Sequence, residues 1–502
     1  MMTPEKTFAP IRTAVMLSAG DGERLRAVAN GRPKCLMELL GVTLLERNLH
    51  ALKEAGIRTV LLVVGYQGHA IEEKVEQLDL DGLTIRCLRN PYWRSENGLS
   101  LMQAREAVSD QQRFLLLMSD HLFDPGTLRD FLSRVPDDDR SHLLVDLSPG
   151  EGVDEDDATY VRLSAHNRVS AIGKGLDQAQ GVDCGAFVLT QDIFPALERS
   201  FAAGDSTLTA ANRRLIQQRS LAGIPLRTGF WQDIDTPTDY QSAKKKLLAT
   251  LPNSGDGLVS RHINRKLSRP LSVWLARTRA TPNQVTLASF FLGLVGAALF
   301  ALGHPLGAGL TIQLSSIVDG TDGELARLKL RTSPWGGFLD ALLDRYADGL
   351  ILLAMGYYAY TLSPGWLPIA LTVAAVFGIP LSMALKDRYH LAFGRSFTSQ
   401  TDDGWTRYLL PNRDGRLLVV MLGGVTGLVL PALAFIAGVS HLVFLRRLWR
   451  VGAQQRPAPS QVTAAFARAP RSVGATLLEP DRSRAVVMAP ELPPSLPPQT
   501  GA

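Results

Sequence analysis

The sequence predicts an α/β domain with a mixed, mainly parallel sheet, followed by an all-α membrane domain of about six transmembrane helices. Three observations lead to this fold class. The chain has 502 residues, too many for one ordinary domain of roughly 100–200 residues. In its first half, short β-rich apolar runs alternate with helical patterns. Its second half contains long runs without a charged residue.

The first half is predicted to form the α/β domain over residues 12–250, after an N-terminal extension of residues 1–11. Strands are expected at Thr13–Leu17, Thr59–Val64 and Phe114–Met118, and a helix at Leu44–Ala55. Alternation of this kind is typical of helices packed on the faces of a mainly parallel sheet.

Three uncharged runs predict the membrane domain, over residues 281–450. Thr281–Gly303, Gly349–Leu385 and Leu417–Leu445 can each cross a hydrocarbon core of about 30 Å. The second and third runs are too long for one span, and Gly and Pro residues interrupt both. With helices expected around residues 305–330 and 336–360, the total is about six spans. A large buried helical core of a soluble protein is the less favoured alternative.

Basic residues beside the spans predict the orientation in the membrane. Residues 258–280 mix apolar residues with six Lys or Arg residues, which suits a juxtamembrane helix facing lipid phosphates. Arg446, Arg447 and Arg450 follow the last span, so the Lys/Arg bias places the first domain on the cytoplasmic side of the cell (inner) membrane. Residues 451–502 are rich in Pro and Ala and are predicted to be a disordered tail.

Composition excludes several other classes of protein. The averages of 46% hydrophobic and 20% charged residues do not fit a disordered or fibrous chain. A net charge of +5 is too small to indicate nucleic-acid binding. The N-terminus has no apolar region of a secretory signal. Three widely spaced cysteines without a CxxC pair argue against a disulfide framework or a zinc site: Cys35, Cys87 and Cys184.

A small-residue loop follows the first predicted strand and could approach phosphates closely. Residues 18–25, SAGDGERL, form neither a Walker A motif nor a complete dinucleotide fingerprint, so a plain turn is the alternative. Arg24 and Lys34 supply cations for a triphosphate. Asp120 stands just after the end of a buried strand, where α/β sheets bind ligands, and its carboxylate could hold Mg²⁺. A second acidic cluster contains Asp233 and Asp235.

These features together resemble the sugar-nucleotidyltransferase family, which has a Rossmann-like fold. The stretch 90–100, NPYWRSENGLS, and the triplet SDH at 119–121 resemble its cytidylyltransferase branch. The resemblance implies Mg²⁺, or Mn²⁺ as an alternative, on Asp120 with Asp233 or Asp235. It implies Lys34 and Arg24 as catalytic cations, and Lys174 and Asp183 beside the phosphorylated acceptor. The implied nucleotide contacts are Ala19, Gly20, Gly22, Arg24, Lys34, Asn97 and Ser100.

Four aspartates at helical spacing mark the membrane half. Asp319 and Asp322 lie three positions apart, and Asp340 and Asp344 lie four apart, so each pair shares a helix face. Carboxylates between apolar helical residues are costly and usually functional. Four of them facing one another would repel unless divalent cations bind them. A solvated charge run is the alternative, but the regular spacing among apolar residues argues against it.

The pattern D-x2-D-G-x2-A-R-x8-G-x3-D-x3-D at 319–344 resembles the signature of CDP-alcohol phosphotransferases. That resemblance covers about residues 258–450. It implies two metal ions on Asp319, Asp322, Asp340 and Asp344, with Asp344 also acting as general base. It implies that Gly323, Arg327 and Ser333 hold the CDP moiety. Asp348 is expected to line the cavity or to be structural. Lys386, Asp387 and Arg388 are candidates for the acceptor's phosphate, although basic flanks of a span are the commoner explanation.

The order of the two domains resembles a family of bifunctional enzymes. The resemblance implies that CTP and inositol 1-phosphate give CDP-inositol and pyrophosphate, and that CDP-inositol and an inositol phosphate then give a di-inositol phosphodiester and CMP. The alternative is the same chemistry on another phospho-alcohol, making a phospholipid head group. A nucleotide-sensing first half and a transporter are weaker hypotheses. The expected partners are CTP, inositol 1-phosphate or a similar phospho-alcohol, the CDP-alcohol and membrane lipid, with a homodimer as a family-level expectation.

Overall fold

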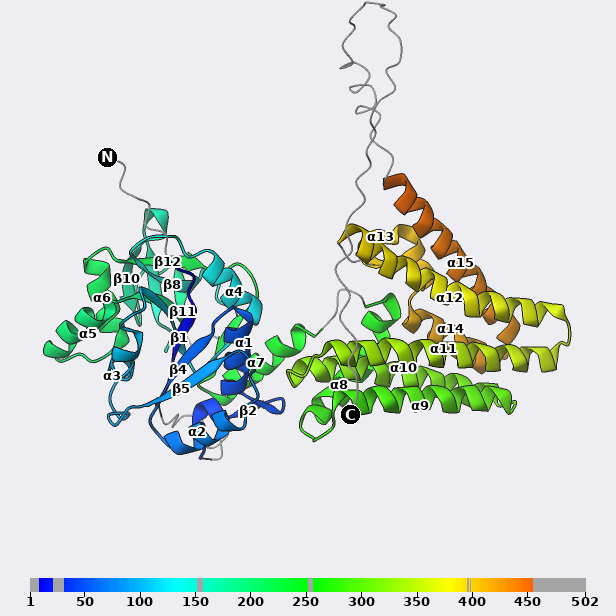
Figure 1. Cartoon of the computed structure of the whole chain (residues 1–502), viewed down its shortest axis with the longest axis horizontal. Coiled ribbons are helices and arrows are strands. Elements are labelled where there is room, and N and C mark those ends of the chain that lie inside the picture. Colours follow the sequence, from blue (N-terminus) through cyan, green and yellow to red (C-terminus); the bar gives the residue numbers. More distant parts are fainter. Residues whose placement is uncertain are drawn as a thin grey trace, which may run out of the picture. The chain divides into compact units, whose positions relative to one another are not determined.

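The computed structural model describes residues 9–20, 31–150, 157–251, 256–394, 397 and 399–454 (Figure 1). The predicted tail lies outside these residues from 455 on, whereas 451–454 continue the last helix. The first domain is built on a nine-stranded sheet. Its centre is parallel, in the order β6 (Arg113–Met118), β1 (Thr13–Ser18), β4 (Thr59–Val64), β5 (Thr84–Arg89).

The other side of the sheet is mixed, as the sequence predicts. β11 (Gly181–Thr190) runs antiparallel to β6, β8 and β9. β8 (Ser141–Asp146) also pairs with β12 (Leu221–Pro225), and β9 (Tyr160–Leu163) also pairs with β10 (Val169–Gly173). Two small sheets complete the domain: β2 (Glu38–Leu39) with β3 (Val42–Thr43), and β7 (His121–Phe123) with β13 (Trp231–Asp233).

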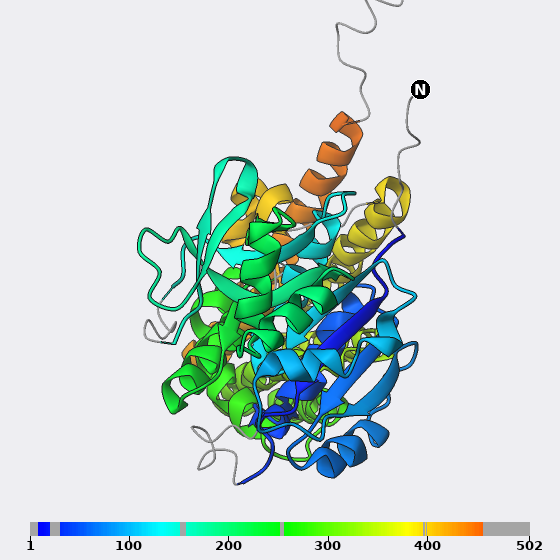
Figure 2. The same cartoon turned by 90° about the vertical axis from the view of Figure 1, so that its left-hand side faces the viewer.

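Alternate residues of the central strands enter two different hydrophobic cores. Ala14 and Met16 of β1 face α1 (Leu44–Glu54), α2 (Gly68–Glu76) and α4 (Pro125–Ser133). Val15 and Leu17 face α3 (Asn97–Met102), α5 (Ile193–Ala202) and α6 (Leu208–Gln217). The strand is therefore covered on both faces, which explains its continuous apolar sequence. In Figure 2 this domain faces the viewer.

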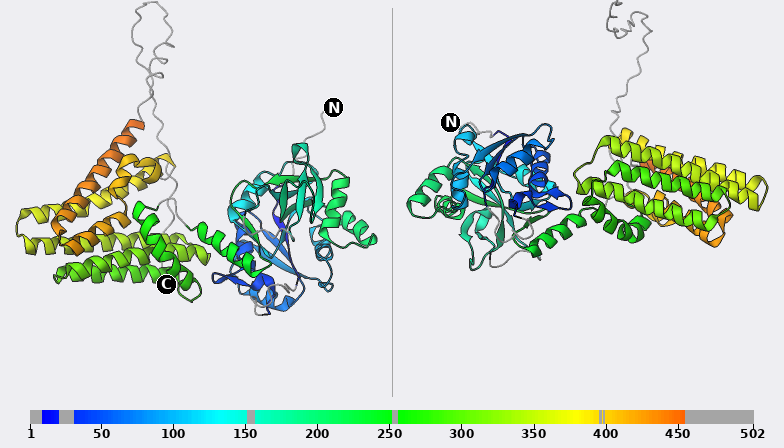
Figure 3. Two further views of the ribbon diagram at one scale, coloured as in Figure 1. Left: turned by 180° about the vertical axis from the view of Figure 1, so that it is seen from behind. Right: turned by 90° about the horizontal axis from the view of Figure 1, so that it is seen from below.

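The end of the first domain and the second half of the chain are helical. α7 (Pro237–Ala249) begins with a capping box between Thr236 and Asp239, and α9 begins with another between Thr281 and Gln284. α9, α10 and α11 lie side by side (Figure 3). The helices after α7 are α8 (Arg265–Ala276), α9 (Pro282–Ala301), α10 (Pro305–Leu328), α11 (Pro334–Leu362), α12 (Trp366–Phe393), α13 (Ser399–Asp402), α14 (Arg413–Thr426) and α15 (Val429–Gln454).

The expected count of six spans is not confirmed. Within the described part of the chain, three helices are long and apolar enough to cross a membrane: Pro282–Ala301, Trp366–Phe393 and Val429–Ala453. α10 and α11 carry the aspartates, and α14 has only 14 residues. The three apolar helices indicate that the second domain associates with a membrane, whereas the first domain has a soluble fold.

Helix α8 buries polar residues and exposes apolar ones. Arg265, Ser268 and Ser272 all donate hydrogen bonds to Glu324, a fully buried residue of α10. On the opposite face, Leu267 is 55% exposed and Trp274 is 63% exposed. This distribution agrees with the amphipathic helix that the sequence predicts, while its place in the membrane interface stays a prediction.

Glycines set the closest contact between α10 and α14. A methyl group on Gly309 of α10 would lie 2.8 Å from the carbonyl oxygen of Met421. One on Gly424 of α14 would lie 2.3 Å from the carbonyl oxygen of Pro305. The two backbones approach so closely that neither position has room for a side chain.

Candidate active sites

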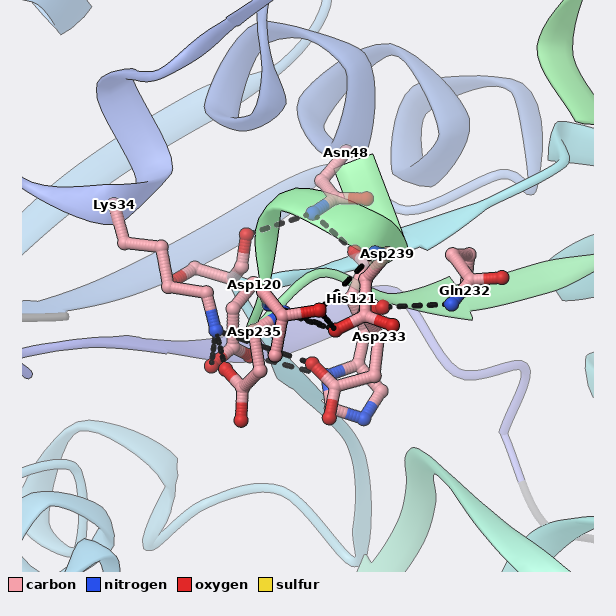
Figure 4. A network of polar contacts seen from close by, with 10 residues as sticks. Lys34, Asn48, Asp120, His121, Gln232, Asp233, Asp235 and Asp239 are labelled. Atoms are coloured by element: carbon pink, nitrogen blue, oxygen red, sulfur yellow. Dashed lines mark hydrogen bonds and ion pairs between the residues drawn. The ribbon is translucent and has the colours of Figure 1, made fainter. Parts of the chain in front are cut away.

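The first candidate site lies at the carboxyl end of β6, where residues from separate parts of the chain come together. Asp120 lies two residues after the end of β6, and the pairing of β7 with β13 places His121 opposite Asp233. Lys34 comes from a short 3₁₀ helix, Lys34–Leu36, early in the chain. Figure 4 shows these side chains, together with Asp235, pointing toward one another.

Lys34 lies at the centre of three carboxylates. Its Nζ donates to Oδ2 of Asp120 at 3.0 Å and to Asp235, and lies 3.9 Å from Oδ1 of Asp233. Burial alone would lower the pKa of Lys34, but the three carboxylates together raise it above its usual range. The ammonium group therefore stays charged at physiological pH.

His121 contacts the same carboxylates, although sequence reasoning gave this histidine no role. Its Nδ1 lies 3.0 Å from Oδ1 of Asp120 and 3.7 Å from Oδ1 of Asp233. Its ring stacks on Trp231, with the ring centroids 5.7 Å apart. Burial lowers the pKa of His121, but Asp233 and Asp120 outweigh it and raise this pKa to about 9. The only signal in the sequence is its place directly after Asp120.

The donor set of this site fits a divalent metal ion. Asp120, His121 and Asp233 each offer a ligand atom, and these atoms lie within 4.8 Å of one another. Oδ1 of Asp233 is buried and has no hydrogen-bond partner among the described residues. Carboxylate oxygens are the usual ligands of Mg²⁺. Asp235, the alternative ligand, pairs with Lys34, as Asp120 does, so the choice between Asp233 and Asp235 stays a prediction.

A cavity of about 160 Å³ adjoins this cluster and brings together some of the predicted residues. Asn97 and Asp183 line it, and Oδ1 of Asn97 also accepts a hydrogen bond from the backbone N–H of Leu208. Oδ1 of Asp183 accepts one from the backbone N–H of Gly185 at 2.8 Å. Burial raises the pKa of Asp183 to about 6. These two predicted residues are therefore placed beside the acidic cluster.

Other predicted residues of this site lie elsewhere or outside the described chain. Ser100 is buried, and its Oγ accepts a hydrogen bond from Asn90 at 3.0 Å. Lys174 is exposed and pairs with Asp157, which lines the cavity. Ala19 and Gly20 follow β1 as expected. Gly22 and Arg24 lie outside the described residues, so their roles stay predictions.

The second candidate site lies between α10 and α11. Asp319, Asp340 and Asp344 offer ligand atoms within 4.8 Å of one another, which also fits a divalent metal ion. Oδ1 of Asp340 is buried without a hydrogen-bond partner in the described ranges. Asp322 accepts a hydrogen bond from Oγ1 of Thr286 at 2.6 Å. Asp322 is not in this group of three, but it lines the same cavity as Asp340.

An arginine that sequence reasoning missed enters this cluster from α14. Nη1 of Arg413 lies 2.7 Å from Oδ2 of Asp319 and 3.0 Å from Oδ1 of Asp344. Arg413 and Arg416 both donate to Asp348, which is 7% exposed. Asp348 therefore orients two arginines. The available signal was a basic pair at helical spacing immediately before the uncharged run 417–445.

One cavity adjoins the aspartates, and a second adjoins Arg413. One, of about 180 Å³, is lined by the predicted CDP-binding residues Gly323, Arg327 and Ser333, together with Asp322 and Asp340. Ser333 also caps α11 by accepting a hydrogen bond from the backbone N–H of Gly336. The other, of about 70 Å³, has four cationic residues in its wall, of which only the first was predicted: Lys386, Arg413, Arg416 and Arg447. Asp387 and Arg388 do not line it.

Comparison with known proteins agrees with this division into two sites. Residues 13–250 match the nucleotidyl transferase family, and residues 279–400 match the CDP-alcohol phosphatidyltransferase family. The chain is thus a nucleotidyltransferase joined to a CDP-alcohol phosphatidyltransferase.

Similar proteins span both halves. The bifunctional IPC transferase and DIPP synthase of Rubrobacter xylanophilus is 37% identical over 452 residues, covering 87% of this chain and 95% of that protein. The protein of the same name from Aquifex aeolicus is 32% identical over 445 residues, covering 88% and 98%. The structure of the inositol-1-phosphate CTP transferase from T. maritima aligns with 48% of this chain and 98% of that chain, at 26% identity and a TM-score of 0.43. The chain belongs to the family of bifunctional IPC transferase and DIPP synthase proteins.

Proposed function

We propose that the first domain converts CTP and inositol 1-phosphate to CDP-inositol and pyrophosphate. In the same proposal, the second domain converts CDP-inositol and an inositol phosphate to a phosphorylated di-inositol phosphodiester and CMP. The observation that carries the proposal is the presence, in one chain, of two separate carboxylate clusters, each beside a cavity. The names of the relatives that span both halves supply the inositol phosphate substrates.

In the first reaction, a phosphate oxygen of inositol 1-phosphate attacks the α-phosphorus of CTP, and pyrophosphate leaves. No covalent enzyme intermediate is needed, so catalysis rests on positioning and on neutralisation of charge. Lys34 supplies a permanent positive charge beside Asp120 and Asp233. A Mg²⁺ ion on Asp120 and Asp233, with Mn²⁺ as the alternative, would add positive charge at the phosphates.

In the second reaction, Asp344 accepts the proton of the acceptor hydroxyl, whose oxygen attacks the β-phosphorus of CDP-inositol while CMP leaves. Arg413 contacts Asp344 and so fixes the carboxylate that acts as base. Gly323, Arg327 and Ser333 would hold the CDP moiety, and the cavity with four cationic residues would hold the acceptor's phosphate. Two metal ions on the four aspartates would stabilise the charge of the leaving CMP.

The proposed location is the cell (inner) membrane, with several spans and with the first domain in the cytoplasm. The three apolar helices and the basic flank of exposed residues on α8 support this. Contact with membrane lipid and a homodimer belong to the same proposal.

The test is incubation of membranes containing the protein with labelled CTP and a panel of phospho-alcohols. We expect CDP-inositol to form first and a water-soluble phosphodiester to follow. A lipid-extractable product would favour the alternative, in which the protein makes a phospholipid head group. Failure to form a CDP-alcohol from any member of the panel would overturn the first reaction.

A further inference from the structure

The lining of the cavity in the first domain includes hydrogen-bond acceptors that the proposed transfer reaction does not use. Asp183 of β11 and Asn212 of α6 line the cavity that also contains Asp233 and Asp235 of the acidic cluster. Since the acidic cluster handles phosphate and metal, the remaining wall is available to the non-reacting part of a substrate. That part of the substrate must therefore carry donors that can form hydrogen bonds with these acceptors.

Asn212 is the residue that most clearly lacks a ligand. Its side chain is only 1% exposed, and its Oδ1 has no hydrogen-bond partner in the part of the chain that the structure describes. A buried amide oxygen left unpaired is costly, so such atoms normally find a donor. Because Asn212 lines the cavity, a bound molecule can supply that donor.

Asp183 can also accept hydrogen bonds from a bound ligand. One of its carboxylate oxygens accepts a hydrogen bond from the backbone N–H of Gly185, at 2.8 Å. A carboxylate has about four acceptor positions, so this contact leaves capacity for further donors. Two acceptors in the wall of one cavity call for a ligand with at least two donors.

We propose that Asn212 and Asp183 select a phosphorylated ring polyol as the acceptor by accepting hydrogen bonds from its ring hydroxyls. This inference rests on the proposed function and adds the groups that read the substrate. A quaternary ammonium phospho-alcohol such as choline phosphate carries no O–H or N–H donor at that end. It leaves Oδ1 of Asn212 unpaired, and a site built around a hydrogen bond rejects such an analogue strongly.

The test is steady-state kinetics of CDP-alcohol formation by the full-length protein, with Asn212→Leu compared with Gln217→Leu. Gln217 is an exposed amide at the end of the same helix, so it controls for the loss of an amide on α6. For Asn212→Leu we expect kcat/KM for inositol 1-phosphate to fall by about 10- to 100-fold, which corresponds to the loss of one or two hydrogen bonds to a buried acceptor. The KM for CTP should not change, and Gln217→Leu should behave as the unaltered protein.

Monodeoxy analogues of inositol 1-phosphate test the contact without relying on the variant's folding. In the unaltered protein, at least one analogue should lose a similar factor, and that analogue should lose nothing further in Asn212→Leu. Equal kcat/KM for all analogues, or a rise in KM for CTP alone, would overturn the inference. These outcomes differ from failure of the proposed function, in which the unaltered protein makes no CDP-inositol.

Discussion

At the scale of single side chains, substitution of one aspartate in each site should separate the two reactions. Asp120→Asn removes a charge from the cluster around Lys34, and Asp344→Asn removes the proposed base beside Arg413. Each change should reduce its own reaction by roughly 10²- to 10³-fold and leave the other reaction intact. Pyrophosphate release from CTP measures the first reaction, and CMP release from supplied CDP-inositol measures the second.

An exposed residue provides the matched control for Asp120. Asp110→Asn changes the same group on the surface of the first domain and should alter neither rate. Undiminished pyrophosphate release by Asp120→Asn would place the first active site elsewhere.

His142 predicts a pH dependence of stability in the first domain. It is 1% exposed on β8, and burial lowers its pKa from 6.5 to about 4. Between these two pH values the unfolded chain binds the proton more readily, so the free energy of unfolding decreases as pH falls from about 6.5 to about 4. The loss is at most about 3 kcal/mol.

Hydrogen–deuterium exchange of β8 in the full-length protein, corrected for the intrinsic effect of pH, measures this loss. Protection of β8 should fall toward pH 4 in the unaltered protein and fall less in His142→Leu. His69→Leu, an exposed histidine on α2, is the control and should follow the unaltered protein. Equal pH dependence in all three would show that other groups control it.

Local patterns carried enough information to predict many of the site residues, but not those that arrive from distant segments. Asp319, Asp322, Asp340 and Asp344 were predictable because helical spacing alone places each pair on one face. Lys34 and Asp235 are 201 positions apart, and only the fold shows that they pair with each other. Arg413 and Asn212 come from separate helices and belong to no motif, and the basic pair at 413 and 416 does not by itself show which carboxylates these arginines contact.

At the scale of elements, α8 depends on one buried carboxylate. Glu324 accepts hydrogen bonds from Arg265, Ser268 and Ser272, so Glu324→Leu leaves a buried arginine and two hydroxyls without this partner. We expect the packing of α8 on α10 to weaken by about 3 kcal/mol. Trypsin should then cleave faster after Lys266, which is exposed on α8 and is followed by Leu267.

The conservative change provides the control for this prediction. Glu324→Gln keeps an acceptor oxygen at the same place and should retain most of the resistance to trypsin. If Glu324→Leu is as resistant as the unaltered protein, the apolar contacts of α8 hold it without the polar ones.

The strands were easier to predict than the spans for a physical reason. Strands such as β4 are covered on both faces, so their apolar runs end where the strand ends. Length and hydropathy recognise α9, α12 and α15, but α10 and α11 contain the four aspartates and α14 is short. An apolar pattern therefore could not show how many of these helices span the membrane.

At the scale of the whole molecule, two separate sites in one chain predict that CDP-inositol is released from the first site before it reaches the second. A mixture of full-length Asp120→Asn and Asp344→Asn proteins should make the phosphodiester, because CDP-inositol from one protein can reach the other. The product should appear after a lag, since the intermediate must first accumulate in solution, whereas the unaltered protein benefits from a high local concentration.

Time courses of phosphodiester formation at equal total protein measure this lag. Absence of product from the mixture, with each variant retaining its own reaction, would mean that both sites must work in one molecule. The division into two domains was predictable from composition, because charge is distributed so differently in the two halves.

The glycine contact between α10 and α14 has a consequence for the charged residues farther along the two helices. The two helices touch at Gly309 and Gly424, and again where Arg413 meets Asp319. At about 1.5 Å per residue, these two contacts are roughly 15 Å apart along each helix. The two glycines thus set the distance between the helices, and with it how closely the guanidinium group of Arg413 approaches the carboxylates. We expect a single methyl group added at either glycine to change the distance between Arg413 and the carboxylates without contacting any of them.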